Sequence, residues 1–218
     1  AATAIDDLAG NSYAGIADAT TLNFTSAADN VAPTLVSSSP ADNATGVAVG
    51  ANIVLTFNEN VDAESGNITL FKTGGATAET IAVGSGLVSV SGNVVTINPN
   101  SLLDSAQGYY VQIASSGFDD VAGNSFAGIN DATTLNFTSA DVVGPTLSSS
   151  SPADNATGVA VGANIVLTFD ENVVAGSGNI TLKKSSDNST IQAMPVGGAN
   201  VSISGAAVTV NPTADFNS

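Results

Sequence analysis

One stretch of this chain occurs twice without a single difference. Residues Ser37–Phe57 read SSSPADNATGVAVGANIVLTF, and Ser149–Phe169 read the same, 112 positions later. A period of that size matches one globular domain rather than one turn of a solenoid. The chain is therefore predicted to be a row of domains copied from one unit.

The copies are out of phase with the two ends of the sequence. Residues 28–140 contain one complete unit, whereas residues 1–27 match only the last part of a unit. Residues 141–218 match the first part of a further unit and stop before the counterpart of AQGYYVQI at Ala106–Ile113. We expect this last part to lack its two final strands and the whole sequence to be a window of a longer array.

Short runs with alternating apolar residues, separated by Gly, Asn, Asp, Ser and Pro, predict an all-β fold. In Asn52–Phe57, for example, the apolar Ile53, Leu55 and Phe57 share one face. Seven or eight strands in about 112 residues are typical of an immunoglobulin-like β-sandwich, here in tandem copies. A tight hairpin is expected at Gly92–Asn93. The expected strands of the complete copy lie near Thr34–Ser38, Asn52–Phe57, Asn67–Lys72, Glu79–Val83, Leu87–Ser91, Val94–Asn98, Tyr109–Ala114 and Thr133–Thr138.

An ordered series of motifs runs through nearly the whole chain: PTLVSSSPADNATGVAVGANIVLTFNENV, NITL, VTINP, YYVQIASSGFDDVAGN and TTLNFT. This series resembles the bacterial Ig-like repeats of S-layer proteins and giant surface adhesins. The resemblance implies a secreted or cell-surface spacer that extends or displays other modules. It transfers no catalytic residue to this chain.

The composition leaves little for catalysis. The chain has no Cys, His, Trp or Arg, and its only basic residues are Lys72, Lys183 and Lys184. We therefore expect no enzymatic activity, since neither a nucleophile with its base nor an aromatic sugar cleft is evident. A net charge of −16 disfavours nucleic acid as a partner and favours divalent cations. No apolar run approaches the roughly 20 residues that span a bilayer, so no membrane insertion is expected.

The junctions between copies are short and contain no flexible Gly/Ser tether. Only AADNVA precedes Pro33, and only ADVVG precedes Pro145. Proline and β-branched residues favour an extended, stiff path. Neighbouring Ig-like repeats are thus the first expected partners, arranged as a rod.

Acidic residues are expected to gather at the pole where each linker enters. In an Ig-like sandwich the loops Asn58–Gly66 and Gly117–Ala132 meet there, and carboxylate and amide oxygens are the ligands that calcium prefers. The candidate calcium ligands are Asp29, Asn30, Glu59, Asp119 and Asp120, with Asp141, Asp170 and Glu171 at the next joint. Asp62 and Glu64 are not essential candidates, because the next copy has Val174 and Gly176 in their place.

The alternative for the same residues is structural. Asp and Asn are ordinary turn formers, and DDVAGN at Asp119–Asn124 is also the composition of a plain loop. The sequence leaves the calcium site and the plain turn as open alternatives.

Three functions follow from these patterns. The first is a non-catalytic spacer of a bacterial cell-surface or extracellular protein, rigidified by calcium at its joints. The second is an adhesive module for glycans or ice, or an accessory domain of a secreted hydrolase, suggested by outward threonines such as Thr56, Thr69 and Thr96. The third is a filament of identical chains joined head to tail, in which Thr20–Thr25 is donated as a last strand, although the missing AQGYYVQI strand argues against full complementation.

Overall fold

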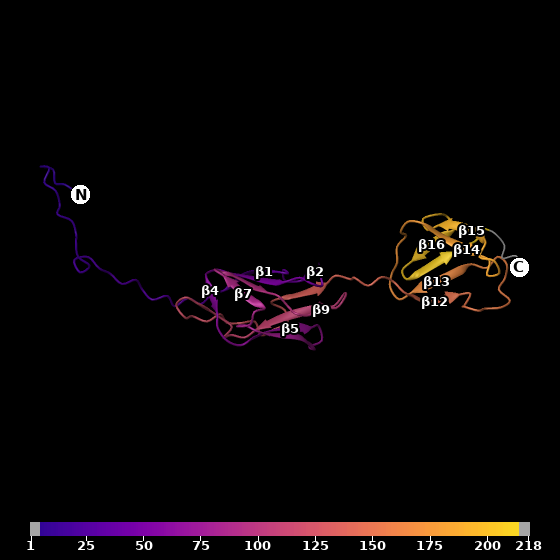
Figure 1. Cartoon of the computed structure of the whole chain (residues 1–218), viewed down its shortest axis with the longest axis horizontal. Coiled ribbons are helices and arrows are strands. Elements are labelled where there is room, and N and C mark those ends of the chain that lie inside the picture. The colour runs from indigo at the N-terminus through magenta and orange to yellow at the C-terminus, as the bar shows by residue number, and fades with distance from the viewer. Residues whose placement is uncertain (1–4, 214–218) are drawn as a thin grey trace. The chain divides into compact units, whose positions relative to one another are not determined.

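The computed structural model describes residues 5–213 (Figure 1), and among these every regular element is a β-strand. The chain divides into two compact units, residues 1–141 (unit 1) and 142–218 (unit 2). No helix in the described part is long and apolar enough to cross a membrane. The predicted fold class, an all-β Ig-like sandwich, is confirmed.

Unit 1 consists of two main sheets and one short strand pair. The four-stranded sheet has the order β1-β3-β8-β7, and the five-stranded sheet has the order β2-β11-β9-β5-β6. All neighbours are antiparallel except β2 and β11, which run parallel. The strands are β1 Leu35–Ser39, β2 Ala44–Val47, β3 Ile53–Phe57, β4 Val61–Ala63, β5 Asn67–Lys72, β6 Thr77–Ala82, β7 Val88–Ser91, β8 Val94–Ile97, β9 Gly108–Ile113, β10 Phe118–Asp120 and β11 Asn136–Ser139.

The core of unit 1 comes from the strict alternation in its central strands. Every second residue of β3 and β9 is buried, because successive side chains of a strand point to opposite faces. Phe57 is 1% exposed and contacts two further aromatic rings, at centroid distances of 5.8 Å to Phe118 and 5.1 Å to Phe126. The loop that carries Phe118 and Phe126 therefore closes one end of the sandwich.

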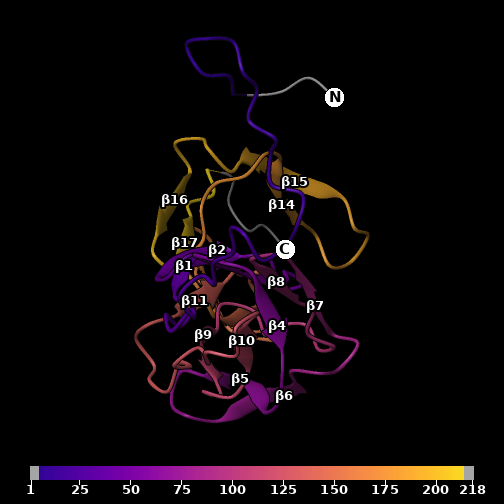
Figure 2. The ribbon, with the colours of Figure 1, turned by 90° about the vertical axis from the view of Figure 1, so that its left-hand side faces the viewer.

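Between residues 5 and 141 unit 1 has eleven strands rather than the seven or eight expected. The additional ones are short: β2, β4 and β10 have only three or four residues each. The strands β4 and β10 pair with each other at the end of unit 1 that faces the viewer in Figure 2. The expected loop Gly117–Ala132 thus contains a strand, whereas the hairpin at Gly92–Asn93 forms as predicted between β7 and β8.

Unit 2 repeats the four-stranded sheet and two of the five strands of the other sheet. Its sheets have the orders β12-β13-β17-β16 and β14-β15. No strand corresponding to β9 or β11 is present among residues 142–213, and the residues that correspond to β2 form no strand there. The strands are β12 Leu147–Ser151, β13 Ile165–Phe169, β14 Asn179–Lys183, β15 Thr190–Pro195, β16 Val201–Ser204 and β17 Ala207–Val210.

Residues 5–26 have the sequence of a β10–β11 segment and keep its local turns. Tyr13 N donates to Ile5 O, as Phe126 N donates to Phe118 O in unit 1. Their apolar side chains stay exposed, however: Phe24 is 89% exposed, whereas its counterpart Phe137 is 3% exposed. The turns of this segment are therefore local structures that form without a sandwich core.

One of these turns makes a testable contribution to acid stability. The oxygens of Asp131 accept hydrogen bonds from the backbone N–H and hydroxyl groups of Thr133 and Thr134. The backbone N–H of Thr133 is the largest cause that lowers the pKa of Asp131 to about 2. Because this folded pKa lies below the unfolded value of about 3.9, the stabilisation is complete above that value and is lost as the pH falls toward 2. Asp131→Asn is expected to lower the Tm of unit 1 by several degrees at pH 7 and to flatten the fall in Tm between pH 4 and pH 2.

Asp18 supplies a matched control for this measurement. It accepts the same four hydrogen bonds from Thr20 and Thr21, and they lower its pKa as well. All side chains of residues 5–26 are exposed, so they add nothing to the core of either sandwich. Asp18→Asn is therefore expected to leave both thermal transitions unchanged. Equal losses in the two variants would show that the Asp131 turn does not act through the sandwich.

Candidate functional site

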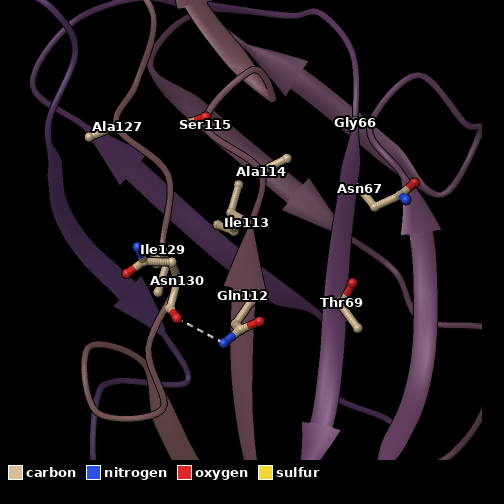
Figure 3. A pocket seen from close by; sticks show the side chains of 10 residues that line it. All are labelled: Gly66, Asn67, Thr69, Gln112, Ile113, Ala114, Ser115, Ala127, Ile129 and Asn130. Atoms are coloured by element: carbon tan, nitrogen blue, oxygen red, sulfur yellow. Dashed lines mark hydrogen bonds between the residues drawn. The ribbon is translucent and has the colours of Figure 1, made fainter.

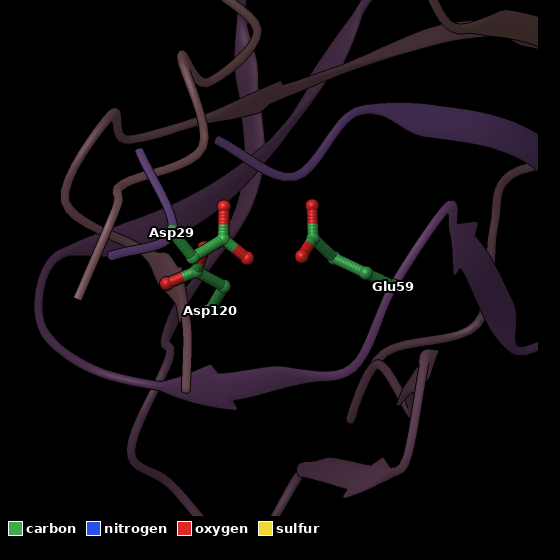
Figure 4. Close-up of side chains that lie close together, drawn as sticks. All are labelled: Asp29, Glu59 and Asp120. Carbon is green, nitrogen blue, oxygen red and sulfur yellow. The ribbon is translucent and has the colours of Figure 1, made fainter. Parts of the chain in front are cut away.

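Three carboxylates meet where the linker enters unit 1. Oxygens of Asp29, Glu59 and Asp120 lie within 4.8 Å of one another (Figure 4). Asp29 comes from the linker before Pro33, Glu59 from the turn after β3 and Asp120 from the end of β10. These three residues, here called the acidic pole, are three of the predicted calcium ligands.

Asp120 is the fixed member of the acidic pole. It is 5% exposed, and its Oδ1 accepts the backbone N–H groups of Ala122 and Asn124, each at 2.8 Å. Its Oδ2 accepts Nδ2 of Asn124 at 2.8 Å. The hydrogen bond from the Asn124 side chain is the main cause that lowers the pKa of Asp120, so this carboxylate stays ionised in the folded state.

The linker is tied to unit 1 beside these carboxylates. Asn124 Nδ2 also donates to the backbone oxygen of Asp29 at 3.3 Å, and Asp29 Oδ1 accepts the N–H of Val31 at 3.0 Å. Glu59 Oε1 accepts Nδ2 of Asn58 at 3.2 Å. Asp120 is therefore held by three hydrogen bonds, whereas the side chains of Asp29 and Glu59 each accept one from a residue one or two positions away.

The acidic pole has the chemistry of a hard-cation site. Its carboxylates border a cavity of about 270 Å³, also lined by Asn60, Val121 and Ala122. Three close negative charges repel one another, and the three lysines of the chain lie elsewhere in the sequence. Calcium takes six to eight oxygen ligands, so the carboxylates would supply part of the coordination shell and water the remainder. Asn60 was not among the predicted ligands, although it lies next to Glu59 in the predicted loop Asn58–Gly66.

Two other candidates of this joint lie outside the acidic pole. Asp119 is opposite Asp62 in the β10–β4 pair, and strand alternation directs its side chain to the other face from Asp120. One of its oxygens is buried and has no hydrogen-bond partner among the described residues. Asn30 is exposed, and its side chain donates to the backbone oxygen of Ala28 at 3.2 Å.

The candidates of the second joint are divided between the two units. Asp141 belongs to unit 1 and accepts a hydrogen bond from the hydroxyl of Ser105 at 2.8 Å. Asp170 belongs to unit 2 and accepts both the backbone N–H and the hydroxyl of Thr146, at 2.7 and 2.6 Å. The Thr146 side chain is the main cause that lowers the pKa of Asp170. Glu171 follows directly in sequence and is half-buried in unit 2.

Comparison with known proteins gives one family match. The family model described as "Bacterial Ig-like domain" matches residues 29–139 and again residues 141–218. No curated protein matches the chain. Among solved structures, the crystal structure of CopC from Methylosinus trichosporium OB3b is similar at 13% sequence identity and a TM-score of 0.37, covering 51% of this chain and 97% of that one. A likeness at this level carries no inference about function.

Proposed function

The chain belongs to the bacterial Ig-like domain family, and from this premise we propose that it is a non-catalytic spacer of a bacterial cell-surface or extracellular protein. Domains of this family typically occur in surface or extracellular proteins and are generally non-catalytic. S-layer proteins and giant adhesins are the classes of parent protein that the sequence resembles. The work of the chain is then to set the distance and the stiffness between other modules.

The observation that carries this proposal is a pair of hydrogen bonds in each unit, which holds the chain where it enters from the linker. In unit 1, Thr34 N donates to Asn58 Oδ1 at 2.6 Å, and Asn58 N donates back to Thr34 O at 3.0 Å. In unit 2, Thr146 and Asp170 form the same reciprocal pair at 2.7 and 3.0 Å. Pro33, next to the first of these pairs, is fully buried. Each unit thus anchors the end of the linker that precedes it. Such anchoring restricts the joint more than a flexible tether does.

We extend the proposal to calcium at the acidic pole. A cation bound by Asp29, Glu59 and Asp120 would connect the linker to two loops of unit 1. It would also remove the repulsion among the three carboxylates. The expected consequence is a joint that is stiffer with calcium than without it.

Small-angle X-ray scattering of the 218-residue chain tests the spacer. A compact protein of this length has a radius of gyration of about 17 Å. We expect a clearly larger value at saturating calcium and a broader distribution of dimensions after chelation with EGTA. A radius near the compact value in both conditions would contradict the spacer, and identical profiles would contradict the calcium-dependent joint.

The same scattering data test head-to-tail assembly. In unit 1 the β10–β11 segment covers the face that contains Phe57, and Phe169 lines an open apolar groove of about 290 Å³ in unit 2. In residues 5–26 of a second copy, Ile5 and Tyr13 stand at the positions of Phe118 and Phe126, and Phe24 stands at the position of the buried Phe137. The spacer predicts a monomer mass of 21.3 kDa at all concentrations. A mass that grows with concentration and returns to the monomer value in Phe24→Ser would instead identify strand donation.

A further inference from the structure

The outer face of the five-stranded sheet in unit 1 carries a groove of about 430 Å³. Figure 3 shows β5 on one side, the 127–130 segment on the other and β9 between them. The groove lies within the complete unit and is separate from the acidic pole, with which it shares no lining residue. Its lining residues are Gly66, Asn67, Thr69, Gln112, Ile113, Ala114, Ser115, Ala127, Ile129 and Asn130.

The walls of the groove are set by backbone contacts. Ile113 and Ile129 exchange hydrogen bonds of 2.8 and 2.9 Å, which hold the 127–130 segment against β9. Gly128 lies so close that a Cβ atom there would be 2.5 Å from the backbone oxygen of Ile113. A Cβ atom on Gly66, at the opposite wall, would be 2.7 Å from that of Ala114. A larger residue at either glycine would displace backbone or Ala114, so both walls of the groove pack closely against the end of β9.

The polar groups of the groove are neutral and partly unused. Gln112 Nε2 donates to the backbone oxygen of Asn130 at 3.0 Å, which fixes the amide and leaves its Oε1 on the side of Thr69 (Figure 3). The side chains of Asn67, Thr69 and Asn130 make no hydrogen bond with other residues in the described part of the chain. Amides and hydroxyls both donate and accept, as the hydroxyl groups of a sugar do.

An aromatic pair continues the same face. Thr69 lies opposite Gln112, and two residues further along the strands Phe71 lies opposite Tyr110. The two rings are stacked at a centroid distance of 5.0 Å and an interplanar angle of 13°, and both are half-buried. Same-face residues two apart on a strand are separated by about 7 Å, so the rings adjoin the groove.

The outward residues of the three central strands are uncharged in a strongly acidic chain. One carboxylate meets this face at its β11 edge, where Asp42 Oδ1 accepts Nδ2 of Asn136 at 2.8 Å. The outward residues of the three central strands are Asn67, Thr69, Phe71, Gly108, Tyr110, Gln112, Asn136 and Thr138. None of the 19 acidic residues of the chain is among them. A ligand that lies over β5 and β9 is therefore selected by hydrogen bonding and apolar contact and not by charge.

We propose that this face of unit 1 binds a neutral oligosaccharide. Its hydroxyl groups would pair with the side chains of Asn67, Thr69, Gln112 and Asn130. The apolar C–H edge of a further sugar residue would rest on the Phe71–Tyr110 pair, whose rings supply apolar surface at little cost in conformational entropy. The spacer would then also be an adhesive module, and this second role does not depend on calcium.

The two copies differ at the position that this proposal makes essential. In unit 2 the strand corresponding to β5 reads NITLKK, so Lys183 stands where unit 1 has Phe71. A cation at this position removes the apolar ring surface. The described part of unit 2 also has no strand corresponding to β9, so the two copies can be compared only at the position of Phe71, where Phe71→Lys imitates the natural difference.

Chemical-shift mapping on the ¹⁵N-labelled chain tests the proposal. The probes are cellohexaose, maltohexaose and hexa-N-acetylchitohexaose, with an oligogalacturonate as the anionic comparison. We expect at least one neutral probe to shift the side-chain amide signals of Asn67, Gln112 and Asn130. The side-chain amide signal of Asn93, which lies in the β7–β8 hairpin of the other sheet and donates to the backbone oxygen of Phe57, is expected to stay in place, and the anionic probe is expected to cause no shift.

Variants connect the binding to the named residues. Phe71→Lys and Gln112→Ala are each expected to weaken binding at least about tenfold, whereas Thr96→Ala on the outward face of the other sheet leaves it unchanged. The backbone amide spectrum shows whether Phe71→Lys is correctly folded. If it is not, Gln112→Ala alone tests the proposal. The proposal is overturned if no neutral probe shifts these signals at millimolar concentration. It is equally overturned if the anionic probe binds as well as the neutral ones, or if correctly folded variants bind like the parent chain.

Discussion

Phe57→Ala is expected to destabilise unit 1 by about 3–5 kcal/mol, the usual cost of removing a fully buried aromatic ring. Phe57 is 1% exposed and packs against Phe118 and Phe126, so its removal leaves a cavity beneath the loop that closes the sandwich. A loss of this size is a large fraction of the stability of an ordinary domain. Urea unfolding followed through amide signals of β3 and β8 measures it.

Phe169→Ala is the matched control, because the residues that precede it, from Ser149 on, are identical to those that precede Phe57. Phe169 ends the same IVLTF strand, but it is half-buried and lines the open apolar groove of unit 2. It therefore has less packing to lose, and signals of β13 and β17 are expected to report a distinctly smaller change. Equal losses in the two units would contradict the argument that the segment from β9 to β11 creates the core around this ring.

The same pair of copies shows what local sequence can and cannot predict. Strong alternation predicted β3 correctly in unit 1, and the identical residues form β13 in unit 2. The ATGV segment does not behave in this way: it forms β2 at Ala44–Val47 and no strand at residues 156–159. In unit 1 its partner is the parallel strand β11, and no such partner is present among the described residues of unit 2. For a segment of four residues, long-range pairing and not propensity decides the conformation.

The candidate site, too, was predictable from sequence only in part. Fold topology predicted which loops meet at the linker, and Asp29, Glu59 and Asp120 are indeed brought together. Sequence could not choose between Asp119 and Asp120, because that choice depends on the phase of the three-residue strand β10. The groove beside β9 was not predicted at all. Its walls depend on the contact between Ile113 and Ile129, which no local pattern reveals.

Calcium is expected to raise the Tm of unit 1, by an amount on the order of 10 °C at a free concentration one hundred times the Kd. The ion would bind the folded acidic pole, whereas in the unfolded chain Asp29, Glu59 and Asp120 are far apart in sequence. Differential scanning calorimetry with calcium and then with EGTA measures the rise. Magnesium at the same concentration is expected to have a smaller effect, because it demands a tighter octahedral shell.

Glu59→Gln distinguishes calcium binding at the three carboxylates from a general effect of acidic residues in this loop. Without calcium this variant is expected to be at least as stable as the parent chain, because one of three mutually repelling charges is removed and the amide can still fold into the same turn. With calcium it is expected to lose most of the rise in Tm. Glu64→Gln, an exposed change in the same loop but outside the acidic pole, is expected to keep the full rise. The calcium proposal is contradicted if the parent chain shows no rise, or if Glu59→Gln and Glu64→Gln respond alike, because the ion would then act on general acidity and not on the three carboxylates that the fold brings together.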